Sequence, residues 1–223
     1  MDDLKIIEVK ESVFEQNDRE ADELREYLRQ NHVFMINLMA SPGAGKTTLL
    51  TETIRRLKDE MNIGVMEADI DAQIDAERIA ASGARSIQIH TGGMCHMDAS
   101  MTRQGLDAFG IEGLDLVVLE NVGNLVCPAE FDTGATENVM LLSVPEGDDK
   151  PLKYPLMFEV SDTVLITKID TRPVFDFDDE AVVRAIRMRN PKAEVMFVSA
   201  KTGEGMDRWC DWLRKKVKED YSK

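Results

Sequence analysis

Near-continuous apolar runs alternate with stretches of helical periodicity along most of the chain. Uniformly apolar runs that are separated by helices are typical of strands in a mostly parallel sheet covered by helices on both faces. The pattern therefore predicts an α/β fold. The runs predict strands at residues 34–39, 63–67, 86–89, 114–119, 139–143, 163–166 and 194–198.

Helical patterns occupy the intervals between several of these runs and also precede the first one. In the charged N-terminal stretch, Ala21, Leu24 and Leu28 fall on one stripe at helical spacing, so we expect an amphipathic helix packed on the main domain. Further helices are predicted at about 47–60, 76–81 and 204–220. We therefore expect an N-terminal helical extension over residues 1–32 and a main domain over residues 33–223.

Composition narrows the classes of protein that this chain can belong to. It has 223 residues and is 43% hydrophobic, which suits one domain with an appendage. No apolar run approaches the roughly 20 residues that cross a bilayer, and no secretory signal is evident, so we expect a cytoplasmic protein without a membrane partner. A net charge of −15 argues against sequence-independent binding of nucleic acid. Three cysteines indicate metal binding or core packing rather than a disulfide framework.

The glycine-rich segment Ala40-Ser41-Pro42-Gly43-Ala44-Gly45-Lys46-Thr47 lies directly after a predicted strand and before a predicted helix. Glycines at these places let backbone N–H groups approach phosphate oxygens, and the helix N-terminus then faces the anion. Lys46 would reach the β- and γ-phosphates, and Thr47 would offer its hydroxyl to Mg²⁺. Ala40 replaces the first glycine of the usual pattern, and the alternative is a turn with a chance lysine. The segment predicts a P-loop NTPase whose phosphate-binding residues are Ser41, Gly43, Ala44, Gly45, Lys46, Thr47 and Thr48.

Acidic residues follow two of the other predicted strands. Glu120 ends the fourth strand and Gly123 comes shortly after it, as in the element that holds Mg²⁺ and senses the γ-phosphate. Asp69 and Asp75 follow the second strand, where they either contact Mg²⁺ or the attacking water, or cap a helix and face solvent. The expected magnesium ligands are Thr47, Asp69 and Glu120, and the expected catalytic residues are Lys46, Asp69 and Asp75.

Two segments near the C-terminus favour guanine over adenine. Thr167-Lys168-Ile169-Asp170 ends a strand and resembles the Asn-Lys-x-Asp element of GTPases, with Thr167 in place of Asn. The carboxylate of Asp170 would accept hydrogen bonds from guanine N1–H and its exocyclic amine, which adenine cannot offer. Ser199-Ala200-Lys201 resembles the loop that backs the base. We therefore expect GTP as the nucleotide. The residues expected around its base are Thr167, Lys168, Asp170, Ser199, Ala200 and Lys201.

Cys95 and His96 follow the third strand, and Cys127 follows the fourth. In a parallel sheet both loops leave the same edge as the phosphate loop, so we expect these three side chains to lie close to one another in space. Thiolate and imidazole ligands suit Zn²⁺ or Ni²⁺, and three of them leave a coordination position open. The alternative is two ordinary buried thiols and a surface histidine. Cys210 lies beside Trp209 in the last helix and is most simply a core residue.

Three segments together resemble the HypB family, GTPases that assist nickel insertion during maturation of nickel–iron hydrogenase. They are residues 41–48, residues 92–99 with their Cys-His-Met-Asp run, and residues 120–128, which read Glu-Asn-Val-Gly-Asn-Leu-Val-Cys-Pro. Residues 143–155 are also similar to the family. The resemblance implies a nickel or zinc site at Cys95, His96 and Cys127 that is coupled to GTP. It also implies a nucleotide-promoted homodimer and, as partners, the hydrogenase large subunit and other maturation proteins.

The expected mechanism is a switch. GTP with Mg²⁺ would order the loops after the second and fourth strands, and hydrolysis would release them. Because Cys127 shares a loop with Glu120 and Gly123, nucleotide state and metal affinity should be linked. No water-positioning glutamine is obvious, so slow turnover is expected. The alternatives are a non-catalytic nickel or zinc carrier whose nucleotide only sets the oligomeric state, a metallochaperone GTPase of the urease-accessory type, and an ATP-dependent small-molecule kinase, which the base elements disfavour.

Overall fold

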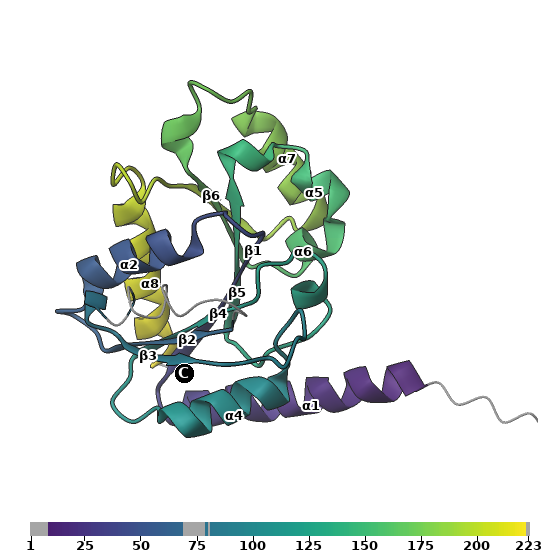
Figure 1. The fold of residues 1–223 in the computed structure, drawn as a ribbon, viewed down its shortest axis with the longest axis vertical. Coiled ribbons are helices and arrows are strands. Elements are labelled where there is room, and N and C mark those ends of the chain that lie inside the picture. The colour runs from purple at the N-terminus through teal and green to yellow at the C-terminus, as the bar shows by residue number, and fades with distance from the viewer. Residues whose placement is uncertain (1–8, 69–78, 80, 222–223) are drawn as a thin grey trace, which may run out of the picture.

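The computed structural model describes residues 9–68, 79 and 81–221 (Figure 1). The strands form one sheet in the order β3-β2-β4-β1-β5-β6-β7, and each neighbouring pair of described strands is parallel. The strands are β1 (Phe34–Ala40), β2 (Ile63–Glu67), β3 (Arg85–Gln88), β4 (Leu116–Glu120), β5 (Glu137–Ser143), β6 (Thr163–Thr167) and β7 (Glu194–Phe197). The α-helices are α1 (Val9–Gln30), α2 (Lys46–Leu57), α4 (Ala99–Phe109), α5 (Lys150–Lys153), α6 (Pro155–Glu159), α7 (Asp179–Arg189) and α8 (Met206–Asp220).

Helices cover both faces of the sheet, as the sequence predicts. The alternation of side chains along β1 shows why: Ile36 and Leu38 face the core beneath α2 and α8, whereas Met35 and Met39 face the opposite layer. On that second face, α1 and α4 lie side by side over one half of the sheet (Figure 1). Helices α6 and α7 cover the other half. The central strands are thus buried from both sides, which explains their continuous apolar runs.

The predicted strands are all present, each within two residues of its expected ends. The helices expected at 47–60 and 204–220 are α2 and α8. The helix expected at 76–81 falls almost entirely outside the described residues. Helices α4 and α7 were not predicted; each begins after an aspartate, Asp98 or Asp178, whose side chain accepts hydrogen bonds from backbone N–H groups of the first turn.

Helix α1 shares the core of the sheet. Ala21, Leu24 and Leu28 are buried, which confirms the predicted apolar stripe, and the two leucines pack in the cluster that contains Met35 of β1. The helix therefore contributes to the packing on which the sheet depends. None of the described helices, α1 included, is both long enough and apolar enough to cross a membrane.

Helix α8 is joined to α2 across the first face of the sheet. The buried Trp209 ring donates a hydrogen bond from Nε1 to the Thr53 hydroxyl over 3.0 Å and stacks on Trp212. Cys210 is buried beside it, and burial raises the pKa of its thiol to about 11. The prediction that Cys210 is a core residue is confirmed.

Gly205, which precedes α8, is expected to be intolerant of any side chain. Its φ is +73°, and a Cβ atom at this position would lie 2.0 Å from the carbonyl oxygen of Phe197. Because that oxygen belongs to the backbone of β7, it cannot move aside cheaply. We expect Gly205→Ala to lower the free energy of unfolding by about 3 kcal/mol or more, measured by urea denaturation.

Gly113 offers a matched control for this substitution. Its φ is also +73°, but a Cβ atom there would meet nothing within 4 Å. We expect Gly113→Ala to cost only the strain of the left-handed backbone, about 1–2 kcal/mol. Equal losses for the two variants would show that the close approach to Phe197 is unimportant.

Candidate functional site

The loops that carry the predicted site residues leave the carboxyl edge of the sheet. Strand β1 lies at its centre, with β4 on one side and β5 on the other, so the chain order diverges there. Ligands of open α/β sheets bind at such a divergence, outside the carboxyl ends of the strands. The phosphate loop follows β1, and the loops after β4 and β6 flank it.

The phosphate loop has the backbone geometry that its glycines allow. Gly43 and Gly45 have φ angles of +78° and +101°, and Ala44 donates a backbone hydrogen bond to the Ser41 carbonyl over 3.3 Å. Gly45 then caps α2, whose first residue is Lys46. This arrangement points the first backbone N–H groups of α2 toward the loop, where they can bind phosphate oxygens.

Lys46 and Glu120 lie together at the base of the loop. Both side chains are buried, and the Lys46 Nζ is 4.0 Å from the Glu120 Oε1. Glu67, at the end of β2, is in register with Glu120 on β4 and is also buried. Sequence reasoning missed Glu67, although it ends an apolar strand just as Glu120 does. The predicted phosphate-binding lysine and magnesium-binding carboxylate are thus adjacent.

A carboxylate braces the first residue of the phosphate loop. The Ser41 hydroxyl hydrogen-bonds to Glu146, whose other oxygen accepts hydrogen bonds from the backbone N–H and the hydroxyl of Ser143. Glu146 was not among the predicted residues. Its spacing from Ser143 is that of a capping box, which could have identified it.

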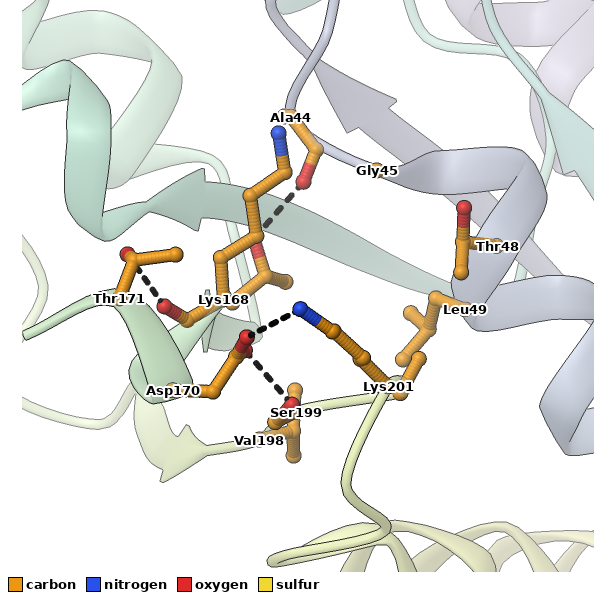
Figure 2. Close-up of a pocket in the computed structure, with 12 residues that line it drawn as sticks. Ala44, Gly45, Thr48, Leu49, Lys168, Asp170, Thr171, Val198, Ser199 and Lys201 are labelled. Atoms are coloured by element: carbon orange, nitrogen blue, oxygen red, sulfur yellow. Dashed lines mark hydrogen bonds and ion pairs between the residues drawn. The ribbon is translucent and has the colours of Figure 1, made fainter.

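A cavity of about 240 Å³ adjoins the phosphate loop on the β6 side (Figure 2). The Asp170 carboxylate lies in its wall, accepts a hydrogen bond from the Ser199 hydroxyl over 2.7 Å, and is 4.0 Å from the Lys201 Nζ. Every residue predicted to recognise the base lines this cavity, together with Ala44, Gly45 and Thr48 of the phosphate loop. The cavity therefore presents a carboxylate beside a phosphate-binding turn.

The loop after β6 is hydrogen-bonded to the phosphate loop. The Thr167 hydroxyl donates to the Ala44 carbonyl over 2.8 Å, and the Lys168 ammonium donates to the Gly43 carbonyl over 2.6 Å. Lys168 adopts a left-handed backbone, with a φ of +56°. Thr167 thus has a bracing role that accounts for a hydroxyl residue in the position where GTPases commonly have asparagine.

On the opposite side, the loop after β4 touches the phosphate loop. A Cβ atom on Gly123 would lie 3.2–3.4 Å from atoms of Pro42, so the two backbones approach closely. Any ligand that displaces one of these loops must therefore affect the other.

The two cysteines predicted as metal ligands are near each other. Cys95 lies in the loop between β3 and α4, residues 89–98, which we call the Cys95 loop; Cys127 lies in the loop between β4 and β5, residues 121–136, which we call the Cys127 loop. The Cys95 thiol hydrogen-bonds to the Cys127 side chain, and this contact is the main cause that raises the pKa of Cys95 above its usual value. The Cys95 Sγ lies 3.9 Å from the His96 Nδ1. The described residues thus gather the three predicted side chains in one region.

Cys95, His96 and Cys127 are not arranged around a common point. Across the part of the chain that the structure describes, no three His, Cys, Asp or Glu side chains converge as they would around one ion. The His96 ring instead stacks on Phe131, with centroids 3.9 Å apart and planes 9° from parallel. Burial lowers the pKa of His96, which favours the neutral imidazole that metals bind. The assignment of Cys95, His96 and Cys127 as metal ligands remains a prediction.

A buried asparagine connects the Cys95 loop to the end of β4. The Asn121 Oδ1 accepts hydrogen bonds from the backbone N–H of Met97 over 3.2 Å and of Val122 over 2.8 Å. Its Nδ2 donates to Asn37, which in turn donates to Asn138. The sequence contains these amides but not their pairing, which depends on three strands meeting. Asn121 therefore lies between Glu120 and the loop of the thiols.

The remaining predicted residues are placed as follows. Thr47 lies in the first turn of α2, where its carbonyl accepts a hydrogen bond from the Thr51 hydroxyl, and Thr48 faces the cavity. Asp69 and Asp75 lie outside the described residues, so their catalytic and magnesium-binding roles remain predictions.

Comparison with known proteins agrees with this geometry. Residues 34–197 match the family described as CobW/HypB/UreG, nucleotide-binding domain. The hydrogenase maturation factor HypB of Escherichia coli K12 is 44% identical over 213 residues, which is 96% of this chain and 73% of that protein. The hydrogenase/urease maturation factor HypB of Helicobacter pylori J99 is 39% identical over 97% of this chain and 90% of its own.

A solved structure agrees over the same length. The crystal structure of HypB from Helicobacter pylori in complex with nickel superposes with a TM-score of 0.86 at 39% identity, covering 92% of this chain and 97% of that one. Likeness of this extent, together with the phosphate loop and the guanine-type cavity, places the protein among the P-loop NTPases of this group. The chain belongs to the HypB family of hydrogenase maturation factors, whose members are GTPases.

Proposed function

We propose that this protein hydrolyses GTP and couples its nucleotide state to nickel held at Cys95, His96 and Cys127, in the cytoplasm, during maturation of nickel–iron hydrogenase. One observation carries the proposal: two thiols and an imidazole gather at the sheet edge that also holds the phosphate loop. Membership of the HypB family supports hydrogenase as the protein that is matured, and the nickel-bound Helicobacter pylori structure supports nickel as the metal.

The phosphate loop and its neighbours supply the groups that hydrolysis requires. In the reaction, water attacks the γ-phosphorus, the bond to the β-γ bridging oxygen breaks, and GDP and phosphate leave. Lys46 would neutralise the β- and γ-oxygens, and the backbone N–H groups around Gly45 would hold them in place. The Asp170 carboxylate would fix the guanine, so that the triphosphate reaches the same position in each turnover.

The donor set beside the phosphate loop suits Mg²⁺. Thr47 contributes a hydroxyl oxygen in the first turn of α2 and Glu120 a buried carboxylate next to Lys46, and hard oxygen donors of this kind are those that Mg²⁺ prefers. When bound, Mg²⁺ would neutralise charge that develops on the β- and γ-phosphates. The chain's own part is to hold Thr47 and Glu120 at the loop by means of α2 and β4.

Coupling between nucleotide and nickel has a physical path through the Cys127 loop. Gly123, expected near the γ-phosphate, and Cys127 lie on this one loop, and Asn121 ties its start to Met97, which follows His96. A γ-phosphate contact that shifts Gly123 would therefore move both thiol-bearing loops. By linkage, nickel must change nucleotide affinity by the factor with which nucleotide changes nickel affinity.

A second copy of the chain would complete the metal site. Met94 and Val126 stand directly before Cys95 and Cys127, and both are exposed apolar side chains. Burial of these residues against a second copy would be favourable, and the ligand set of one chain leaves room for donors from another. We therefore include a nucleotide-promoted homodimer in the proposal.

Nickel titration in two nucleotide states tests the proposal. We expect the protein with GDP and the protein with a non-hydrolysable GTP analogue to bind Ni²⁺ with affinities that differ by about 5-fold or more, the lower range of measured coupling energies. The affinity would be measured by competition with a chromophoric chelator, and mass in solution would be read alongside. We expect a larger share of dimer with the GTP analogue.

The three cysteines provide the matched control. Cys127→Ala should abolish the difference in nickel affinity between the GDP and GTP-analogue states. Cys210→Ala, which removes a buried thiol from α8, should retain that difference. Equal nickel affinity with GDP and with the GTP analogue would contradict the coupling. Nickel binding that survives Cys127→Ala unchanged would contradict the site.

A further inference from the structure

Asn17 on α1 holds both thiol-bearing loops at once. This buried side chain accepts a hydrogen bond at Oδ1 from the backbone N–H of Ala99 over 3.0 Å, and it donates from Nδ2 to the carbonyl of Asp132 over 3.0 Å. Ala99 begins α4 directly after the Cys95 loop, and Asp132 lies within the Cys127 loop. One amide therefore fixes the separation of the two loops.

An aromatic stack connects α1 to the imidazole. The Phe14 ring centroid lies 5.1 Å from that of Phe131, and the Phe131 ring also stacks nearly parallel on His96, with centroids 3.9 Å apart. Stacked rings resist rotation of their members because a turned ring loses its contact area. The direction in which His96 presents its nitrogens therefore depends on the position of α1.

An ion pair fixes the far end of the Cys127 loop to the same helix. The Arg25 guanidinium binds the Asp132 carboxylate, and its Nε donates to the Ala135 carbonyl over 3.0 Å. The pKa of Arg25 is raised, because its bonds to Asp132 outweigh the effect of burial. The Cys127 loop thus contacts the phosphate loop near its start, at Gly123, and contacts α1 in its second half, from Phe131 onward.

We infer that α1 is a positioning element for the metal site, in which Asn17 sets the spacing of the two thiol-bearing loops and Phe14, through Phe131, sets the direction of His96. The inference rests on the proposed nickel site at Cys95, His96 and Cys127. It gives the site a second input besides the nucleotide, because Asn17 and Phe14 reach the two thiol-bearing loops from α1 and not from the phosphate loop.

The consequence is a selective loss of metal affinity. Residues that orient metal ligands typically contribute about 10-fold to 100-fold to metal affinity. We expect Asn17→Leu and Phe14→Leu each to weaken Ni²⁺ binding by about 10-fold or more, with an altered thiolate-to-nickel charge-transfer absorption. Affinity for GDP should stay unchanged, because none of these contacts reaches the phosphate loop or the base cavity.

Two substitutions on the same helix serve as controls. Phe14→Tyr keeps the ring and should bind Ni²⁺ as the unchanged protein does. Gln16→Ala removes an exposed side chain whose hydrogen bond stays within α1, to Glu20, and should have no effect. A role in folding alone would lower the unfolding temperature of Phe14→Leu without changing the nickel spectrum.

The outcomes separate this inference from the proposed function. If the full chain binds Ni²⁺ through Cys127 and both Asn17→Leu and Phe14→Leu bind it equally well with an unchanged spectrum, α1 does not position the site and the nickel function stands. If Cys127→Ala binds Ni²⁺ as well as the unchanged chain, the proposed site itself is wrong. Parallel loss of Ni²⁺ and GDP binding in Phe14→Leu would show a general structural effect and overturn the positioning role.

Discussion

Replacement of Lys46 with alanine is expected to reduce kcat for GTP hydrolysis by about 100-fold to 1,000-fold, the usual cost of removing a group that stabilises charge in the transition state. The Lys46 ammonium is buried at the base of the phosphate loop, where water screens it little. Phosphate release measured under single-turnover conditions would give the rate without contributions from GDP release.

Two companion variants make this result specific. Lys46→Ala also removes a positive charge from beside the buried Glu120 carboxylate, which costs stability, whereas Lys46→Arg keeps the charge but not the compact geometry of the ammonium. Lys58→Ala removes an exposed lysine that follows the other end of α2 and should hydrolyse GTP normally. Hydrolysis that persists in Lys46→Ala would contradict the assigned role. Undiminished nickel delivery by a Lys46→Ala protein that no longer hydrolyses GTP would instead favour the non-catalytic carrier.

Replacement of Asp170 with asparagine is expected to weaken GTP binding by at least about 100-fold, because two hydrogen bonds to a charged acceptor contribute about 1.5–3 kcal/mol each. The asparagine amide would donate toward the guanine exocyclic amine, which is itself a donor. It would also lose the contact of the Asp170 carboxylate with the Lys201 ammonium. Fluorescence titration with labelled GTP and competing unlabelled nucleotides would measure the change.

Xanthosine triphosphate distinguishes altered recognition from damage to the fold. Its base keeps the N1–H and replaces the exocyclic amine with an oxygen, which the amide of Asp170→Asn can satisfy. We expect this variant to bind xanthosine triphosphate more tightly than GTP, and the unchanged protein to prefer GTP to both ATP and xanthosine triphosphate. Tighter binding of ATP than of GTP by the unchanged protein would overturn the guanine assignment.

The five inner strands were predictable because they are buried on both faces and read as apolar runs, whereas the edge strands β3 and β7 are more exposed. Helix α7 also carries local signals, since Asp178 caps it and its last turn carries Arg187 and Arg189. Helix α4 was harder, because Gly105 in its interior weakens helix propensity. The structure shows why the glycine is there: a Cβ atom would lie 2.5 Å from Ile89. Tertiary packing, which no local pattern records, favours it, because the Ile89 side chain would have to shift to admit a Cβ atom.

The residues of the candidate site also divide into those that a local sequence pattern predicts and those that depend on tertiary packing. Residues of the phosphate loop and the base cavity were predicted because their chemistry is encoded in contiguous segments. The proximity of Cys95 and Cys127 followed from the rule that parallel strands share a carboxyl edge. Asn17 could not be found in this way, because its partners are 82 and 115 residues distant and depend on where α1 packs. An asparagine within a helix, where it is unfavourable, was the single local signal.

The hydrogen bonds from Thr167 and Lys168 to the phosphate-loop carbonyls have a further consequence for selectivity. They hold the guanine and phosphate surfaces in one preorganised unit before a nucleotide arrives, so little conformational entropy is lost there on binding. Apart from the proposed contacts of the phosphate loop with the γ-phosphate, the groups that this unit recognises are common to GDP and GTP. In the proposed mechanism, the terminal phosphate is then discriminated by Lys46 and by the other wall, from Glu120 to Gly123, and that wall continues directly into Cys127.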